Sequence, residues 1–221
     1  MKDRVEALAR REEADPAAAD SLDALWLRCQ QRLFAHVAHD MKGVLNGVSV
    51  NVEVVRGRAG RPETLAADVM RYADAASAQL GVVIKMTTAL LSIGRGARGL
   101  AEVSAIARQL VGLLEDTLSS DGAKIDLAID GGLSGATSAP PSAVRLALGE
   151  ALLSVVVQKR DVAVRVRATA TPTVEIRSEA SVEMFPDVGR ALADAGIHVK
   201  TDGHGISMVF PAPTETPIEE A

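Results

Sequence analysis

Aromatic residues and cysteine are scarce in this chain of 221 residues, and acidic residues outnumber basic ones. Aromatic side chains make up 2% of the sequence, so platforms on which nucleic-acid bases could stack are few. The formal net charge of −5 argues against a protein that binds a phosphate backbone. The single cysteine, Cys29, excludes an internal disulfide bond and suits a reducing compartment. These absences argue against a nucleic-acid partner and favour partners that are proteins.

Long apolar runs are also missing where a targeting segment is expected. Residues 1–20 are charged and alanine-rich, without the apolar core of a signal peptide. The longest apolar candidate elsewhere, Leu146 to Val157, is interrupted by Glu150 and is shorter than the roughly 20 residues needed to span a bilayer. The sequence therefore predicts a cytoplasmic protein that does not enter a membrane.

Two heptad patterns fill the first half of the chain. They predict one helix from about residue 21 to 56 and a second that begins at Pro62, which together make a helical hairpin over 21–94. One hairpin cannot bury apolar stripes this broad, so we expect two copies to form a four-helix bundle and hence a homodimer. The stripes are Leu27, Phe34, Met41, Val48 and Val55 with Val37 and Val44 in the first helix, and Val69, Ala76, Val83 and Leu90 with Leu65, Tyr72, Met86 and Ile93 in the second.

The second half of the chain has shorter periodic segments. After a Gly/Arg linker at 95–100, residues 101–211 follow the order helix–strand–helix–strand–strand–helix–strand–strand, which predicts an α/β sandwich. We expect residues 1–20 to be flexible or to form a short helix, and residues 212–221 to be a disordered tail. The predicted fold class is therefore α+β, a long helical hairpin followed by an α/β sandwich.

A cluster of chemically active side chains lies in the first predicted helix. His39 occupies the outermost heptad position, and His36 lies on a neighbouring outer position. Asp40 directly follows His39, and Lys42 is three residues after His39. A neutral imidazole has one free lone pair, and an adjacent carboxylate can hold the proton of the other ring nitrogen. This arrangement suits transient phosphorylation of His39, with Lys42 steadying the phosphoryl charge. The alternative is an exposed histidine without a role.

Glycines continue the same helix ridge. His39, Gly43 and Gly47 are spaced by four, and a glycine inside a helix costs about 1 kcal/mol relative to alanine. The missing side chains leave a shallow lane beside the histidine, through which a loop of another protein can approach. The alternative is that these glycines serve close helix packing, which fits less well because the ridge faces outward in the heptad frame.

The run from Phe34 to Val44 resembles the phosphoacceptor box of bacterial sensor histidine kinases. The resemblance implies that His39 is the phosphoacceptor, that Asp40 orients it and acts as general base, and that receiver domains of response regulators dock here. Gly43 replaces the Thr or Asn that many of these kinases use for phosphatase activity, so that activity is not expected. The matching positions are Phe34, His39, Asp40, Met41 and Lys42, continued by Leu45 and Asn46, and the implied docking residues are His36, Gly43, Asn46 and Gly47.

Residues 101–211 resemble the ATP-binding domain of the same kinases, although less closely. Where that domain has two asparagines on one helix, this chain has Glu150, expected as a surface carboxylate, and Ser154. No glycine occurs between Glu150 and Val188, and a short loop replaces the nucleotide lid. The resemblance therefore implies a degenerate domain that does not bind ATP. No cofactor or metal is expected on this chain, and Mg²⁺ would come with the receiver.

The sequence thus predicts a dimeric histidine phosphotransferase that passes a phosphoryl group between receiver aspartates through His39. Three alternatives stay open: a non-catalytic pseudokinase adaptor that only binds receivers, a divergent ATP-dependent histidine kinase, and a scaffold in which the His-Asp pair has no role. His198 and His204 are expected in structural or solvent-exposed positions.

Overall fold

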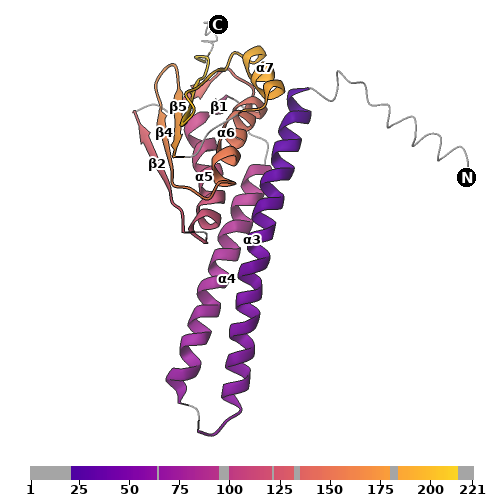
Figure 1. The fold of residues 1–221 in the computed structure, drawn as a ribbon, viewed down its shortest axis with the longest axis vertical. Coiled ribbons are helices and arrows are strands. Elements are labelled where there is room, and N and C mark those ends of the chain that lie inside the picture. The colour runs from indigo at the N-terminus through magenta and orange to yellow at the C-terminus, as the bar shows by residue number, and fades with distance from the viewer. Residues whose placement is uncertain are drawn as a thin grey trace, which may run out of the picture.

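The computed structural model describes residues 21–63, 65–94, 100–120, 122–131, 135–179 and 184–213. Figure 1 shows a long helical hairpin that extends from an α/β domain. The predicted α+β fold class is therefore confirmed, whereas the four-helix bundle of two copies stays a prediction. The expectations for residues 1–20, for linker residues 95–99 and for tail residues 214–221 lie outside the described part of the chain.

The hairpin consists of α3 (Leu22–Ala59) and α4 (Ala66–Gly94). Helix α3 begins where the sequence predicts, because the Ser21 hydroxyl accepts a hydrogen bond from the backbone N–H of Ala24 at 3.3 Å. The prediction that Pro62 opens the second helix is wrong. Pro62 lies in the turn, since the chain needs several residues to reverse direction between two antiparallel helices.

The α/β domain contains a sheet of five strands in the order β2-β4-β5-β7-β6. Strand β2 pairs in parallel with β4, and the remaining neighbours are antiparallel. Valines at alternate positions of β4 are buried while the residues between them are exposed, so one face of the sheet packs on helices. The strands are β2 (Ile125–Asp130), β4 (Val162–Arg167), β5 (Thr173–Ser178), β6 (His198–Thr201) and β7 (Gly205–Val209).

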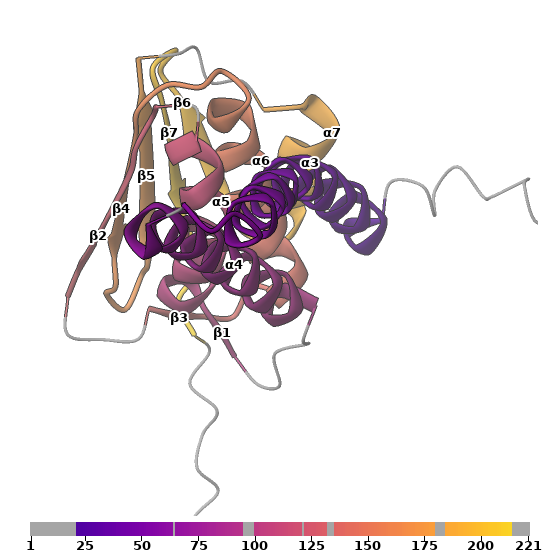
Figure 2. The same cartoon turned by 90° about the horizontal axis from the view of Figure 1, so that it is seen from below.

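The element order predicted for the α/β domain is found, with one addition. Strands β1 (Ala101–Glu102) and β3 (Ala136–Thr137) form a small second sheet, which sequence patterns missed because two residues show no periodicity. Helices α5 (Val103–Ser120) and α6 (Pro141–Val156) lie between the main sheet and the hairpin, as Figure 2 shows, and α7 (Pro186–Asp194) lies beside α6 and α3.

Helix α6 packs against the first half of α3, and the two parts share one hydrophobic core. The buried side of α3 here is formed by residues four apart, namely Leu25, Cys29, Leu33 and Val37. Leu27, which the heptad pattern places in the buried stripe, is exposed. The heptad pattern predicts the side of α3 that other helices of a bundle would cover. Helix α6 of the α/β domain covers another side of α3, which the pattern does not predict. Whether the two parts act as separate domains stays a prediction.

Helix α4 is more apolar than the sequence analysis recognised. Within Ala66–Ile93, a window of 18 residues has a mean hydropathy of 1.4, and by length and composition alone this helix of the described chain is able to cross a membrane. The expectation that Leu146 to Val157 is the longest apolar candidate is therefore wrong. A bundle helix whose outer face is covered by a partner helix has the same composition.

Gly149 allows the close approach of α6 to α3. A Cβ at this position would lie 2.8 Å from Cys29 Sγ and 3.4 Å from Leu33 Cδ1, whereas a Cβ at Gly112 would meet nothing within 4 Å. We expect Gly149→Ala to destabilise the protein by about 1–3 kcal/mol through overpacking. The control Gly112→Ala should stabilise it by about 0.5–1 kcal/mol, because alanine favours the helix. Urea unfolding followed by circular dichroism measures both; equal changes would contradict the packing role of Gly149.

Candidate functional site

His39 and Asp40 form a hydrogen-bonded pair on the surface of α3. The His39 side chain is 88% exposed, and its Nδ1 lies 3.2 Å from Asp40 Oδ1. Because a carboxylate only accepts hydrogen bonds, Nδ1 carries the proton and donates it. The other ring nitrogen, Nε2, then keeps its lone pair free. The arrangement is that of an oriented imidazole nucleophile on an exposed helix surface.

A depression of about 330 Å³ lies beside this pair, where three helices meet. Sequence analysis missed the contribution of α5, the Asp116 carboxylate, because only the tertiary fold brings α5 next to α3. Asp116 Oδ1 accepts a hydrogen bond from Lys85 Nζ at 3.2 Å, which joins α5 to α4. The depression is lined by His39, Asp40, Gly43 and Val44 of α3, Gln79, Val82 and Met86 of α4, and Asp116 of α5.

Lys85 bridges two acidic side chains at this junction. Its Nζ lies 3.2 Å from Glu115 Oε2 and 3.2 Å from Asp116 Oδ1. Partial burial acts to lower the pKa of Lys85, but the hydrogen bonds to Asp116 and Glu115 outweigh it and raise that pKa. The lysine therefore stays charged and holds Asp116 at the edge of the depression.

The two glycines of the predicted ridge have different surroundings. A Cβ at Gly43 would meet nothing within 4 Å, so the approach to His39 is open there. A Cβ at Gly47 would clash with the Gln79 side chain of α4. The prediction that the whole ridge faces outward is thus wrong at Gly47. Each step of four residues turns the ridge by about 40°, which brings Gly47 round to α4.

Lys42 and Asn46 are exposed on α3. The contact of Lys42 with a phosphoryl group, and the contacts of Asn46, Gly43 and Gly47 with a receiver, stay predictions.

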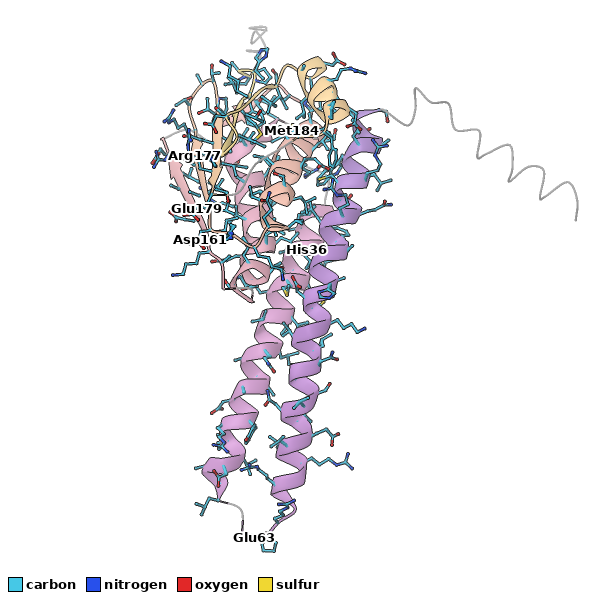
Figure 3. All side chains as sticks on the ribbon, in the orientation of Figure 1. His36, Glu63, Asp161, Arg177, Glu179 and Met184 are labelled. Atoms are coloured by element: carbon cyan, nitrogen blue, oxygen red, sulfur yellow. The ribbon has the colours of Figure 1, made fainter. Side chains whose placement is uncertain are left out.

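His36 does not lie on the outer side of α3, and that prediction is wrong. The residue is half-buried, and its Nε2 atom is buried without a hydrogen-bond partner. Three residues before His39, the helix has turned by about 60° from the direction of His39. His36 lies where α3 passes the α/β domain (Figure 3). A heptad pattern carries no signal of that domain, so the sequence could not predict the burial.

Glu150 is not a surface carboxylate, as the sequence analysis expected, because it lies on the buried side of α6. Its side chain is 6% exposed and accepts hydrogen bonds from Arg32 Nη1 at 2.9 and 2.8 Å. The Arg32 guanidinium also lies 5.3 Å from the ring centre of Phe185. Burial, and next the charge of Glu150, raise the pKa of the Cys29 thiol well above its usual range. Glu150 thus fastens the α/β domain to the hairpin.

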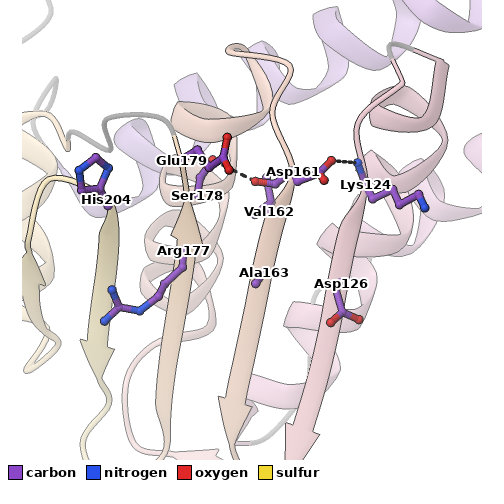
Figure 4. Close-up of a pocket in the computed structure, with 9 residues that line it drawn as sticks. All are labelled: Lys124, Asp126, Asp161, Val162, Ala163, Arg177, Ser178, Glu179 and His204. Atoms are coloured by element: carbon purple, nitrogen blue, oxygen red, sulfur yellow. Dashed lines mark hydrogen bonds between the residues drawn. The ribbon is translucent and has the colours of Figure 1, made fainter.

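A larger depression of about 680 Å³ lies on the sheet face away from the helices, as Figure 4 shows. Asp161 at its rim accepts a hydrogen bond from the Lys124 backbone at 2.8 Å. Ser178 and Glu179 also line it, while residues 180–183 lie outside the described part of the chain. Among the described residues, no group of three or more His, Cys, Asp or Glu side chains forms a metal site.

No protein-family model and no curated protein sequence matches the chain. Among solved structures, the cytoplasmic segment of histidine kinase QseC is similar at 15% identity over 61% of this chain and 93% of that chain, with a TM-score of 0.42. Acinetobacter baumannii histidine kinase AdeS is similar at 10% identity over 79% and 98%, with a TM-score of 0.35. Histidine kinase ThkA, in complex with response regulator protein TrrA, is similar at 13% identity over 85% and 62%, with a TM-score of 0.35. These are histidine kinases, the family that the sequence resembles.

The Arg32–Glu150 pair predicts an asymmetric response to mutation. Arg32→Met leaves a buried carboxylate unpaired and should destabilise the protein by about 2–4 kcal/mol. Glu150→Gln leaves an arginine that is 46% exposed and hydrated, so its cost should be about 1 kcal/mol. The double variant Arg32→Met/Glu150→Leu should recover most of the loss. Urea unfolding checks the order, and a larger cost for Glu150→Gln would contradict it.

Proposed function

We propose that this chain is a histidine phosphotransferase of a two-component phosphorelay, in which His39 passes a phosphoryl group between the aspartates of two receiver domains. The observation that supports this most directly is the exposed His39 ring, whose Nδ1 is 3.2 Å from Asp40 Oδ1. An imidazole held in this way presents Nε2 as a nucleophile, and the open position of Gly43 lets a partner reach it.

The proposed reaction consists of two displacements at phosphorus. The Nε2 lone pair of His39 attacks the aspartyl phosphate of the first receiver, the N–P bond forms, and the P–O bond breaks to leave a carboxylate. Asp40 accepts the Nδ1 hydrogen bond and balances the positive charge that develops on the ring. A carboxylate of the second receiver then attacks phosphorus, and the electron pair of the N–P bond returns to Nε2. Lys42 steadies the phosphoryl charge, and the receivers supply Mg²⁺.

ATP is not part of the proposed reaction. Glu150, where the resembling kinase domain has one of its two asparagines, is engaged by Arg32. No glycine lies between Glu150 and Val188 to let a backbone approach phosphates. These features favour a phosphotransferase or a receiver-binding adaptor over a divergent kinase.

The proposed active form is a cytoplasmic homodimer. Three large apolar residues of α4, at spacings of four and seven, lie on one exposed helix face: Leu80, Ile84 and Leu91. A second exposed apolar stripe on α3 includes Leu45 and Val52. Exposed stripes of this kind are stable in water when a second hairpin covers them in a four-helix bundle.

We expect His39→Gln to abolish phosphoryl transfer without loss of folding, because Gln keeps polarity but lacks the imidazole nucleophile. Asp40→Asn should slow transfer by about 10²-fold, because an amide does not hold the Nδ1 proton in the same way. Incubation with radiolabelled phospho-receivers, followed by a test for acid-labile label on the protein, measures both.

The same assay separates the alternatives. Receivers that bind the wild type without labelling it would identify an adaptor. Receivers that neither bind nor label it would favour a scaffold. Label taken directly from ATP would identify a kinase and contradict the proposed absence of nucleotide binding.

Ile84→Glu should convert the dimer to a monomer at micromolar concentration, because it places a charge in the centre of the proposed interface. Ala78→Glu adds the same charge to an exposed position on another side of α4 and should leave the dimer intact. Sedimentation equilibrium measures the two masses. A wild-type monomer would rule out the homodimer.

A further inference from the structure

Two polar atoms next to the candidate phosphoacceptor are buried without a hydrogen-bond partner. One is Nε2 of His36 and the other is Oδ2 of Asp40, whose Oδ1 is bonded to His39. Buried polar atoms in folded proteins are almost always paired, with another group or with an ordered water. Both atoms therefore require a partner that is close by and shielded from bulk solvent.

The positions of these two atoms make them candidates for each other. His36 and Asp40 are four residues apart on α3, so their side chains leave the helix one turn apart on nearly the same side. Their chemistry is complementary, because an imidazole N–H donates and a carboxylate accepts. The buried Oδ2 of Asp116 has no partner either, but as a carboxylate oxygen it accepts and cannot satisfy Asp40.

The Asp40–His39 bond also needs support. Adjacent residues on a helix point about 100° apart, so Asp40 reaches the His39 ring only from a restricted set of rotamers. A carboxylate held at one oxygen alone can rotate away from the ring, whereas a second hydrogen bond on the inner oxygen fixes its direction.

We propose that His36 is a positioning residue for phosphoryl transfer. Its Nε2–H donates to Asp40 Oδ2, directly or through one buried water, while Asp40 Oδ1 accepts from Nδ1 of His39. The carboxylate thus lies between an inner imidazole that fixes it and an outer imidazole that reacts. His36 forms no bond to phosphorus and gives up no proton. The inference rests on the proposed function for its catalytic consequence, but not for the contact itself.

The contact is tested first without any activity measurement. In ¹⁵N-labelled protein, long-range ¹H–¹⁵N spectra should show the His36 ring protonated at Nε2. Asp40→Ala should change that resonance strongly, while the ring signals of the exposed His198 stay unchanged. A His36 ring that is protonated only at Nδ1, or one that does not respond to Asp40→Ala, would overturn the proposal.

The catalytic consequence is tested by a double-mutant cycle. His36→Leu should slow transfer from saturating phospho-receiver by about tenfold and leave the receiver affinity unchanged. A tenfold change in rate corresponds to the free energy that one hydrogen bond contributes. His36→Gln, whose amide N–H replaces Nε2–H, should restore most of the rate, and His198→Gln should have no effect. In an Asp40→Ala background, His36→Leu should cause no further loss.

Each other outcome has a definite meaning. An equal loss in the Asp40→Ala background, or a loss of receiver affinity in place of rate, would overturn the positioning role. If His36→Leu does not fold, His36→Gln and the spectra of the wild type decide instead. If wild-type protein takes up no label at all, the proposed function fails, while the spectra still decide the contact between His36 and Asp40.

Discussion

The attachment of α6 to α3 is the constraint on which the rest of the structure depends. Gly149 lets the two helices approach until the Cys29 sulfur fills the space that a side chain would take, and Arg32 covers the Glu150 carboxylate at the same place. An ion pair with one buried partner contributes little net stability. It does disfavour every packing of α6 on α3 in which the Glu150 carboxylate is buried without Arg32. The α/β domain is therefore held at one position along the hairpin.

This attachment determines the surroundings of the candidate phosphoacceptor. It places the end of α5 against the hairpin, where Lys85 holds Asp116 beside the depression next to His39. It also covers the inner side of α3, which separates a half-buried His36 from an exposed His39. A domain that resembles a nucleotide-binding domain thus becomes part of the wall of the histidine site. In the proposed phosphorelay, a receiver would meet one preformed surface built from α3, α4 and α5.

The sequence could predict features that depend on neighbours along the chain. Ser21 caps α3 because a hydroxyl next to the first turn needs only that turn. The exposure of His39 follows from its place opposite the apolar stripe, and the open space at Gly43 follows from the missing side chain. The alternating valines of β4 likewise determined a strand with one buried face. Each of these signals has a period or a local partner that can be recognised in the sequence.

Only the tertiary structure decided the features that depend on contacts between distant segments. The burial of Glu150, the closeness of Gly47 to Gln79, and the place of Asp116 beside His39 all arise between helices that are far apart in sequence. A heptad pattern records which side of a helix is apolar, but not which element covers a polar side. The sequence by itself therefore determined the hairpin, the sandwich and the exposed histidine, whereas the packing of α5 and α6 decided which polar groups around that histidine are buried.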